Sequence, residues 1–244
     1  MKRAWGVGVL AAGMMVACGG PDQDGGLVAP VPDGADCVRS GVDGVTCYPT
    51  EGIGRDARPA STNQRRAVLD AYGDRIPNLK FVGFRAVTPE LPMDTTQGTT
   101  VVQLADYFDP KAEKYSLIVL NACAVWCDLC HQLADELASG VASAYAPKGV
   151  VILQAITAGL DYKPSTTADL ESYAQGHRAN FSILADPGER TLGIFDLQAP
   201  ALPFLIVVDA RTMEIVQYTT GKPVDLGRYF DRALATVHSR PPKP

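Results

Sequence analysis

Hydrophobic and polar residues follow the periods of strands and helices in turn from about residue 73 to residue 239. Residues 117–120 and 150–156 are apolar runs with almost no interruption, which is typical of central parallel strands covered on both faces. The segment between them places an apolar side chain at every fourth position, the spacing of one face of a helix: Leu129, Leu133, Leu137 and Val141. This succession predicts an α/β domain.

Further elements are predicted on both sides of this central unit. We expect strands at residues 78–84, 99–104 and 182–184, a hairpin at 204–209 and 214–218, a helical turn at 106–108, and helices at 64–72, 127–145, 166–178, 187–195 and 224–238. Strands that alternate with helices and then end in a hairpin and a helix predict a mixed sheet flanked by helices.

Residues 1–18 have the pattern of an export signal. Lys2 and Arg3 precede an apolar run that is too short to span a membrane, and small residues precede Cys18. The end of the run resembles a bacterial lipobox with Met15 at the place where Leu is usual. We therefore expect Cys18 to carry a lipid; the alternative is an ordinary secretory signal in which Cys18 is incidental. Both predict an extracytoplasmic protein, and the lipid adds attachment to a membrane facing the periplasm or the cell surface.

Residues 19–72 are predicted to form a flexible tether and an N-terminal extension. Residues 19–36 are rich in Gly, Pro and Asp and contain too few apolar side chains for a packed core. Cys37 and Cys47 flank a glycine-rich loop, and in an oxidising compartment such a pair predicts a structural disulfide. The alternative, a second redox pair, has no strand–helix junction to support it. Residues 73–239 then form the folded domain and residues 240–244 a short tail.

Composition excludes one class of function. The chain has a formal net charge of −5, and no stripe of basic residues stands out. Nucleic-acid binding depends on such basic surfaces, so it has no support here.

The candidate chemistry lies at the end of the first apolar run. Cys127 and Cys130 form a Cys-x-x-Cys pair at the junction between the predicted strand and the predicted helix. The first turn of a helix has unpaired N–H groups and the positive end of the helix dipole, so the pKa of Cys127 should be lowered. Cys130 lies one turn further on, within reach of a mixed disulfide at Cys127. The pair is suited to a two-electron dithiol–disulfide cycle.

The region from about residue 73 to residue 238, two-thirds of the chain, resembles the thioredoxin-fold redoxins. It is most similar to the membrane-anchored, periplasm-facing thiol–disulfide oxidoreductases of cytochrome c maturation. The residues that carry this resemblance are Asn121, Trp126, Cys127, Cys130 and the Leu202-Pro203-Phe204 sequence before an apolar strand.

The resemblance implies a thioredoxin-like three-layer fold and a role for each matching residue. Cys127 and Cys130 would be the redox-active disulfide, with Trp126 covering the rim of the site. Pro203 would be a cis-proline facing the disulfide and, with Leu202, would help to dock an extended substrate. The implied partners are protein thiols or disulfides and a membrane electron donor, and no cofactor or metal is expected.

Several positions depart from the family pattern. Asp128 and Leu129 separate the cysteines, where Gly-Pro is common, and Asp128 can either oppose the Cys127 thiolate or satisfy first-turn N–H groups. Asn121 replaces a buried acid of cytosolic thioredoxin, and Leu133 replaces a Glu found in the periplasmic group. Neither familiar proton carrier is therefore present. Asp135 and its neighbour Glu136 are expected to face solvent.

Two other groups near the pair have less specific signals. Cys123 could be a third redox thiol, but we favour a small buried residue. His131 could favour the thiolate electrostatically, but we favour a surface histidine on the helix. His177 and His238 show no partner at metal-ligand spacing.

Two other functions fit the same fold less well. A peroxiredoxin-like peroxidase would need a Thr where Ala124 stands. A copper-binding chaperone would need a Cys-x-x-x-Cys spacing, one residue longer than the spacing here. A closed zinc site would have to use Cys123, Cys127, Cys130 and His131, which the strand–helix junction restricts too much for tetrahedral geometry.

Overall fold

The computed structural model describes residues 37–40, 44–49, 73–193 and 201–240, with only the backbone for 37–46. The predicted signal, most of the tether, the predicted helix at 64–72 and the tail from 241 lie outside the described residues. Within them, no helix combines the length and the apolar character needed to cross a membrane.

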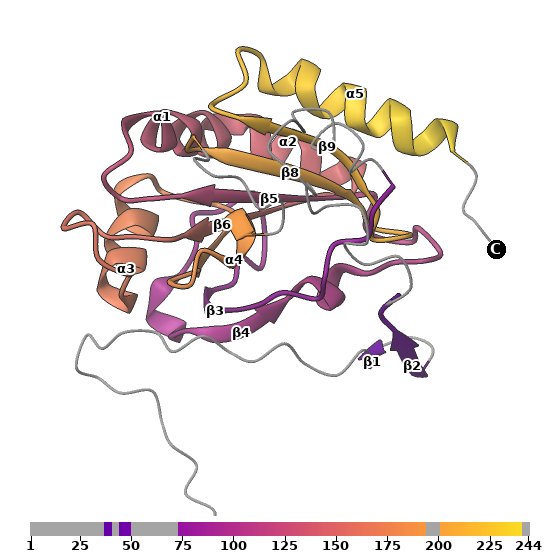
Figure 1. Cartoon of the computed structure of the whole chain (residues 1–244), viewed down its shortest axis with the longest axis horizontal. Coiled ribbons are helices and arrows are strands. Elements are labelled where there is room, and N and C mark those ends of the chain that lie inside the picture. Colours follow the sequence, from indigo (N-terminus) through magenta and orange to yellow (C-terminus); the bar gives the residue numbers. More distant parts are fainter. Residues whose placement is uncertain (1–36, 41–43, 50–72, 194–200, 241–244) are drawn as a thin grey trace, which may run out of the picture.

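The domain is built on a twisted seven-stranded mixed sheet (Figure 1). The strand order is β4-β3-β7-β6-β5-β8-β9, so β5 lies near the middle. It runs parallel to β6, which runs parallel to β7, whereas β8 pairs with β5 in the antiparallel direction. The strands are β3 (Lys80–Phe84), β4 (Thr100–Gln103), β5 (Leu117–Cys123), β6 (Val150–Ile156), β7 (Ser182–Ala185), β8 (Phe204–Asp209) and β9 (Ile215–Thr220). This confirms the predicted mixed sheet and the predicted terminal hairpin.

Helices and two apolar cores complete the three layers. The helices are α1 (Asp128–Glu136), a π-helical turn (Leu137–Val141), α2 (Ala142–Tyr145), α3 (Thr167–Gly176), α4 (Arg190–Gly193) and α5 (Leu226–Ser239), with 3-10 turns at η2 (Thr95–Gln97), η3 (Leu104–Tyr107) and η5 (Ala146–Lys148). Alternate residues of β5 point to opposite faces. Val119 packs with α1, α3 and α5, and Leu120 packs with η3 and α4 on the other face. Every residue of β5 is buried, as its continuous apolar pattern predicts.

Two helices differ in detail from the prediction. The helix that follows Cys127 reaches Tyr145 as expected, but it is interrupted by the π-helical turn, where Gly140 has φ 147°. Such a backbone angle is open to glycine and strained for other residues. The helix predicted from Pro187 begins only at Arg190, and its predicted end lies outside the described residues.

Tyr48, in the described part of the N-terminal extension, contributes its side chain to the domain core. Strands β1 (Cys37–Ser40) and β2 (Gly44–Cys47) form an antiparallel hairpin, and Tyr48 follows it. The ring of Tyr48 is buried, its hydroxyl donates to the Ile76 carbonyl, and it packs against Phe108 at 6.1 Å between ring centroids. The predicted domain start at residue 73 therefore leaves out a residue that belongs to the packed core.

Candidate active site

The cysteine pair lies where the sequence predicts, between the end of β5 and the start of α1. Cys127 is the N-cap of α1, with extended backbone angles, and its sulfur accepts a hydrogen bond from the Cys130 N–H at 3.2 Å. The two sulfurs form a disulfide, with 5.2 Å between the Cα atoms. Cys127 is 6% exposed and Cys130 is fully buried. Of the two residues, Cys127 is thus the more accessible to another molecule.

Pro203 follows a cis peptide bond, as the resemblance implies. It directly precedes β8, and β8 pairs with β5 so that Phe204 lies opposite Ala122. Pro203 is therefore level with Cys123, at the same end of the sheet as the disulfide. Its carbonyl accepts from the Gly221 N–H at 2.7 Å, which ties this turn to the end of β9.

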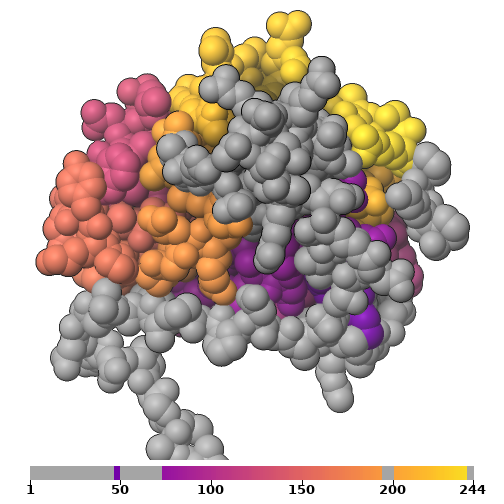
Figure 2. Space-filling view, in the orientation of Figure 1, coloured from indigo at the N-terminus to yellow at the C-terminus, as the bar shows by residue number. Residues whose placement is uncertain are grey.

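Exposed apolar side chains lie beside Cys127 in sequence and in a neighbouring loop. Trp126 is 39% exposed and stacks on Tyr162, with 5.1 Å between ring centroids. Tyr162 and Leu160 belong to the loop between β6 and α3, and both are strongly exposed, as is Leu129 to a lesser degree. The Val125 N–H donates to the Ala158 carbonyl at 2.8 Å and joins this loop to the active-site segment. In the space-filling view the two segments lie side by side at one edge of the molecule (Figure 2).

Leu160 and Tyr162 have no sequence motif that assigns them to the site. The loop from Thr157 to Ser165 follows a buried parallel strand, and such a position at the carboxyl end of a sheet is a signal for a functional loop. What the sequence did not reveal is that this loop reaches the Trp126 ring.

A polar group lies in the apolar core directly beneath the disulfide. The Tyr173 hydroxyl of α3 donates to the Cys130 carbonyl at 3.0 Å and accepts from the Gln154 side chain at 2.8 Å. Burial raises the pKa of Tyr173 far above its ordinary value, so the hydroxyl stays protonated. It is a fixed donor under the first turn of α1.

Asn121 and Cys123 form a second buried polar contact at the end of β5. The Asn121 amide donates to the Cys123 sulfur at 3.1 Å, and both residues are fully buried. Burial raises the pKa of the Cys123 thiol well above its ordinary value, and the Asn121 contact opposes this only in part. Cys123 is a free thiol and lies among apolar side chains, in line with the reading of a small buried residue.

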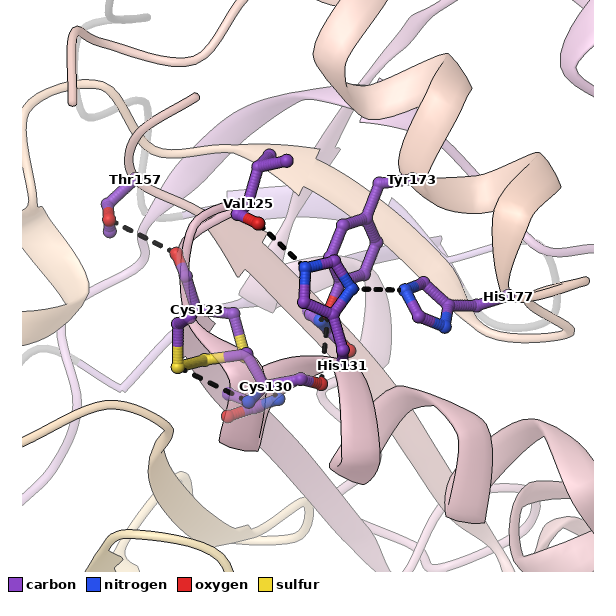
Figure 3. The surroundings of a disulfide bond; sticks show 10 residues. Cys123, Val125, Cys130, His131, Thr157, Tyr173 and His177 are labelled. Atoms are coloured by element: carbon purple, nitrogen blue, oxygen red, sulfur yellow. Dashed lines mark hydrogen bonds between the residues drawn. A yellow bond between two sulfur atoms is a disulfide. The ribbon is translucent and has the colours of Figure 1, made fainter. Parts of the chain in front are cut away.

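The prediction that His131 is a surface histidine is wrong. The His131 ring is half-buried, with Nε2 at 2.7 Å from the Val125 carbonyl and Nδ1 at 2.7 Å from Nε2 of His177 (Figure 3). His177 in turn places Nδ1 at 2.6 Å from the Asp135 carboxylate. The two histidines are 46 positions apart in sequence, so only the packing of α3 against α1 brings them together.

The acidic residues near the pair have different surroundings. Asp128 and Asp135 are exposed, but Asp135 is bound to His177, and Glu136 forms an ion pair with Lys222. The N-cap acceptor of α1 is the Cys127 sulfur rather than a carboxylate. Leu133 is fully buried.

The remaining predicted sites concern metals and the outer cysteines. In the described part of the chain, no three His, Cys, Asp or Glu side chains lie close enough together to hold a metal ion. Cys47 is part of a disulfide, and the backbone of Cys37 lies opposite Cys47 in the β1–β2 hairpin. The Cys37–Cys47 bond stays a prediction, because the Cys37 side chain lies outside the described atoms, as does Cys18.

Known proteins were compared with the chain in sequence and in structure. No protein-family model and no curated protein matches the sequence. Among solved structures, an uncharacterized conserved protein from Geobacillus kaustophilus has a TM-score of 0.50 and 20% identity, and the match covers 71% of this chain and 85% of that one. A DsbF homologue from Corynebacterium diphtheriae gives 0.46 and 17%, over 67% and 87% of the two chains. Peroxidoxin BcpB from Mycobacterium tuberculosis gives 0.48 and 14%, over 70% and 97%.

The arrangement of the domain identifies its fold. A Cys-x-x-Cys pair follows the central strand β5 at the start of α1, and a cis-proline precedes the antiparallel strand β8 beside it. Two parallel strands, β6 and β7, continue the sheet on the other side of β5. This chain has a thioredoxin-like fold, with the Cys127–Cys130 disulfide between the central strand β5 and α1.

Proposed function

We propose that this protein is a thiol–disulfide oxidoreductase that exchanges electrons between Cys127–Cys130 and the thiols or disulfides of other proteins. The observation that carries the proposal is the closed Cys127–Cys130 disulfide at the N-terminus of α1, in which Cys127 is 6% exposed and Cys130 is fully buried. Such a disulfide can accept two electrons without any metal or cofactor.

The order of the reaction steps follows from the difference in exposure between Cys127 and Cys130. A thiolate of the partner attacks the Cys127 sulfur, the Cys127–Cys130 bond breaks, and a mixed disulfide forms with Cys127. The second thiol of the partner then attacks the partner sulfur that is bonded to Cys127. A disulfide forms within the partner, and Cys127 leaves as a thiolate. In the opposite direction Cys127 attacks a substrate disulfide and Cys130 resolves the intermediate. First-turn N–H groups, including that of Cys130, stabilise the Cys127 thiolate.

Docking of the partner is assigned to the rim of the site. Trp126 offers an exposed ring, and Leu202 and Pro203 offer the backbone of a cis turn at the same end of the sheet. An extended substrate segment would lie across this turn, where backbone groups can bind it as an added strand.

The location is proposed from the N-terminal sequence. Export through residues 1–18 and lipidation of Cys18 would hold the domain at a membrane on a tether formed by residues 19–36. If the protein reduces its substrates there, a membrane electron donor must regenerate its dithiol, because the periplasm is kept oxidising.

Reduction of insulin disulfides by dithiothreitol is the direct test of the activity. The wild-type domain should accelerate insulin precipitation, Cys127→Ser should abolish the acceleration, and Cys130→Ser should accumulate mixed disulfides with insulin. Cys123→Ser is the matched control, because Cys123 is buried and outside the disulfide, and it should retain activity. Full activity of Cys127→Ser would contradict the proposal.

A further inference from the structure

A continuous hydrogen-bonded chain links the active-site segment to an exposed carboxylate. It runs from the Val125 carbonyl through His131 to His177, with two contacts of 2.7 Å (Figure 3). It then continues from His177 to the Asp135 carboxylate at 2.6 Å. Val125 lies two residues before Cys127, and His131 directly follows Cys130. The His131 ring therefore bridges the two ends of the short segment that carries both cysteines.

The number of protons in this chain follows from its three contacts. A carbonyl oxygen only accepts, so His131 Nε2 must carry a proton. The contact between His131 Nδ1 and His177 Nε2 needs one proton between the two nitrogens. An ionised Asp135 also only accepts, so His177 Nδ1 must carry a proton. The four ring nitrogens together hold three protons, one more than two neutral imidazoles have.

The additional proton belongs to the histidines rather than to the carboxylate. An isolated imidazole has a pKa of about 6.5, whereas an Asp carboxylate has one of about 3.9, so the imidazole is the stronger base. The Asp135 side chain is 67% exposed and can stay ionised in contact with water, whereas that of His177 is only 11% exposed.

The surroundings hold the pair in place and determine its electrostatics. The Tyr173 ring of α3 packs against both imidazoles, with centroids at 5.2 Å from His131 and 4.5 Å from His177. Asp135 and His177 also line a surface cavity of about 490 Å³, to which Glu90 contributes a second acid and Arg178 a base. Asp128, which is exposed, lies in the first turn of α1, three positions before His131. Asp135 and Glu90 favour a positive charge on the pair, and Arg178 opposes it.

We propose that His131 and His177 share one proton and act as positioning residues that hold a single positive charge beside the Cys127–Cys130 pair. The Val125 carbonyl and the Asp135 carboxylate fix the two ends of this charged pair. The charge stabilises the Cys127 thiolate and thereby favours the reduced form of the site.

This role rests on the proposed function and enters the reaction at one point. When a dithiol reduces the Cys127–Cys130 disulfide, it loses two electrons and two protons and itself becomes a disulfide. Cys130 takes up one proton, Cys127 is left as a thiolate, and the second proton goes to solvent. The positive pair lowers the free energy of this product and leaves that of the oxidised site little changed, so it raises the reduction potential.

The first test counts protons and does not depend on activity. Long-range proton–nitrogen NMR correlations of the imidazole rings report whether each nitrogen is protonated. At near-neutral pH the oxidised protein should show three protonated nitrogens in the His131–His177 pair. Two protonated nitrogens would mean a neutral pair and would overturn the proposal, whether or not the protein is an oxidoreductase.

The second test measures the charge through the equilibrium with glutathione. His177→Gln keeps a donor for His131 but cannot take up a proton. At near-neutral pH its reduction should be disfavoured by on the order of tenfold relative to wild type, which corresponds to about 30 mV. The difference should become smaller as the pH rises, because only the wild-type pair carries a charge that loss of a proton can remove. His238→Gln is the matched control, because His238 is exposed near the end of α5, and it should match wild type throughout.

Two results of the second test would contradict the proposal. An equal loss at every pH would mean that His177 has only a structural role, and no loss at neutral pH would mean that the charge does not reach the sulfurs. A wild-type protein that does not equilibrate with glutathione at all would instead refute the proposed function, and the proton count would still stand by itself.

Discussion

Removal of the Tyr173 hydroxyl should destabilise the domain far more than the loss of one oxygen atom suggests. Tyr173→Phe keeps the ring, which is 97% buried between α3 and α1, and removes only the group that joins Gln154 to the Cys130 carbonyl.

The magnitude follows from the two hydrogen bonds. Loss of the bond to the Cys130 carbonyl costs about 0.5–1.5 kcal/mol. The Gln154 amide is fully buried, and without the hydroxyl its donor is left without a partner, which costs about 1–3 kcal/mol more. The free energy of unfolding should therefore fall by roughly 2–4 kcal/mol, and the Tm of a domain of this size by about 4–16 °C.

Urea unfolding of the oxidised protein, followed by circular dichroism, measures this loss. A second variant, Tyr173→Phe with Gln154→Leu, removes both partners and should recover a large part of the stability, because no unpaired donor then remains. A loss below about 0.5 kcal/mol for Tyr173→Phe, or a double variant whose loss equals the sum of the two single losses, would refute this account of the buried group.

Three further predictions concern other parts of the domain. Gly83→Ala should destabilise the fold by about 1–3 kcal/mol in the same urea assay, because the added Cβ would overlap the β7 backbone. Gly176→Ala is the control: its added Cβ would meet no atom within 4 Å, so the change should be neutral or slightly stabilising. Equal effects of the two changes would refute the packing argument. Cys123 should resist iodoacetamide at mildly alkaline pH in the folded protein and react only after unfolding. Burial raises the pKa of its thiol, and the thiolate is the reactive form. Alkylation of Cys123 in the folded protein, found by mass spectrometry, would contradict this. Trp126→Ala and Tyr162→Ala should each raise the KM for insulin several-fold and leave the glutathione equilibrium nearly unchanged, whereas an unchanged KM would remove the stacked rings from the docking surface.

The sequence predicts the sheet well because its central strands have an unmistakable pattern. The apolar run of β5 can only be buried on both faces, and a Cys-x-x-Cys pair after it places the site at a helix start. The cis state of Pro203 follows from the family resemblance and not from the residues themselves, because trans bonds predominate even before proline.

Contacts between distant segments are what the sequence could not predict. His131 has the local pattern of a surface histidine, and only the packing of α3 against α1 gives it His177 and then Asp135 as partners. Tyr162 similarly lies in a polar loop whose contact with Trp126 depends on the path of that loop after β6. The kink at Gly140 is a smaller example, because a glycine in a helical pattern is compatible with both a straight and a bent helix.

The reduction potential of the Cys127–Cys130 pair tests the central claim most directly. The purified domain would be equilibrated in glutathione buffers of graded ratio, its thiols trapped with a maleimide, and the modified cysteines identified by mass spectrometry. We predict one reversible two-electron transition in which Cys127 and Cys130 are labelled together and Cys123 is not. A pair that stays oxidised or reduced at every attainable ratio, or a transition that involves Cys123 in place of either residue, would contradict the account.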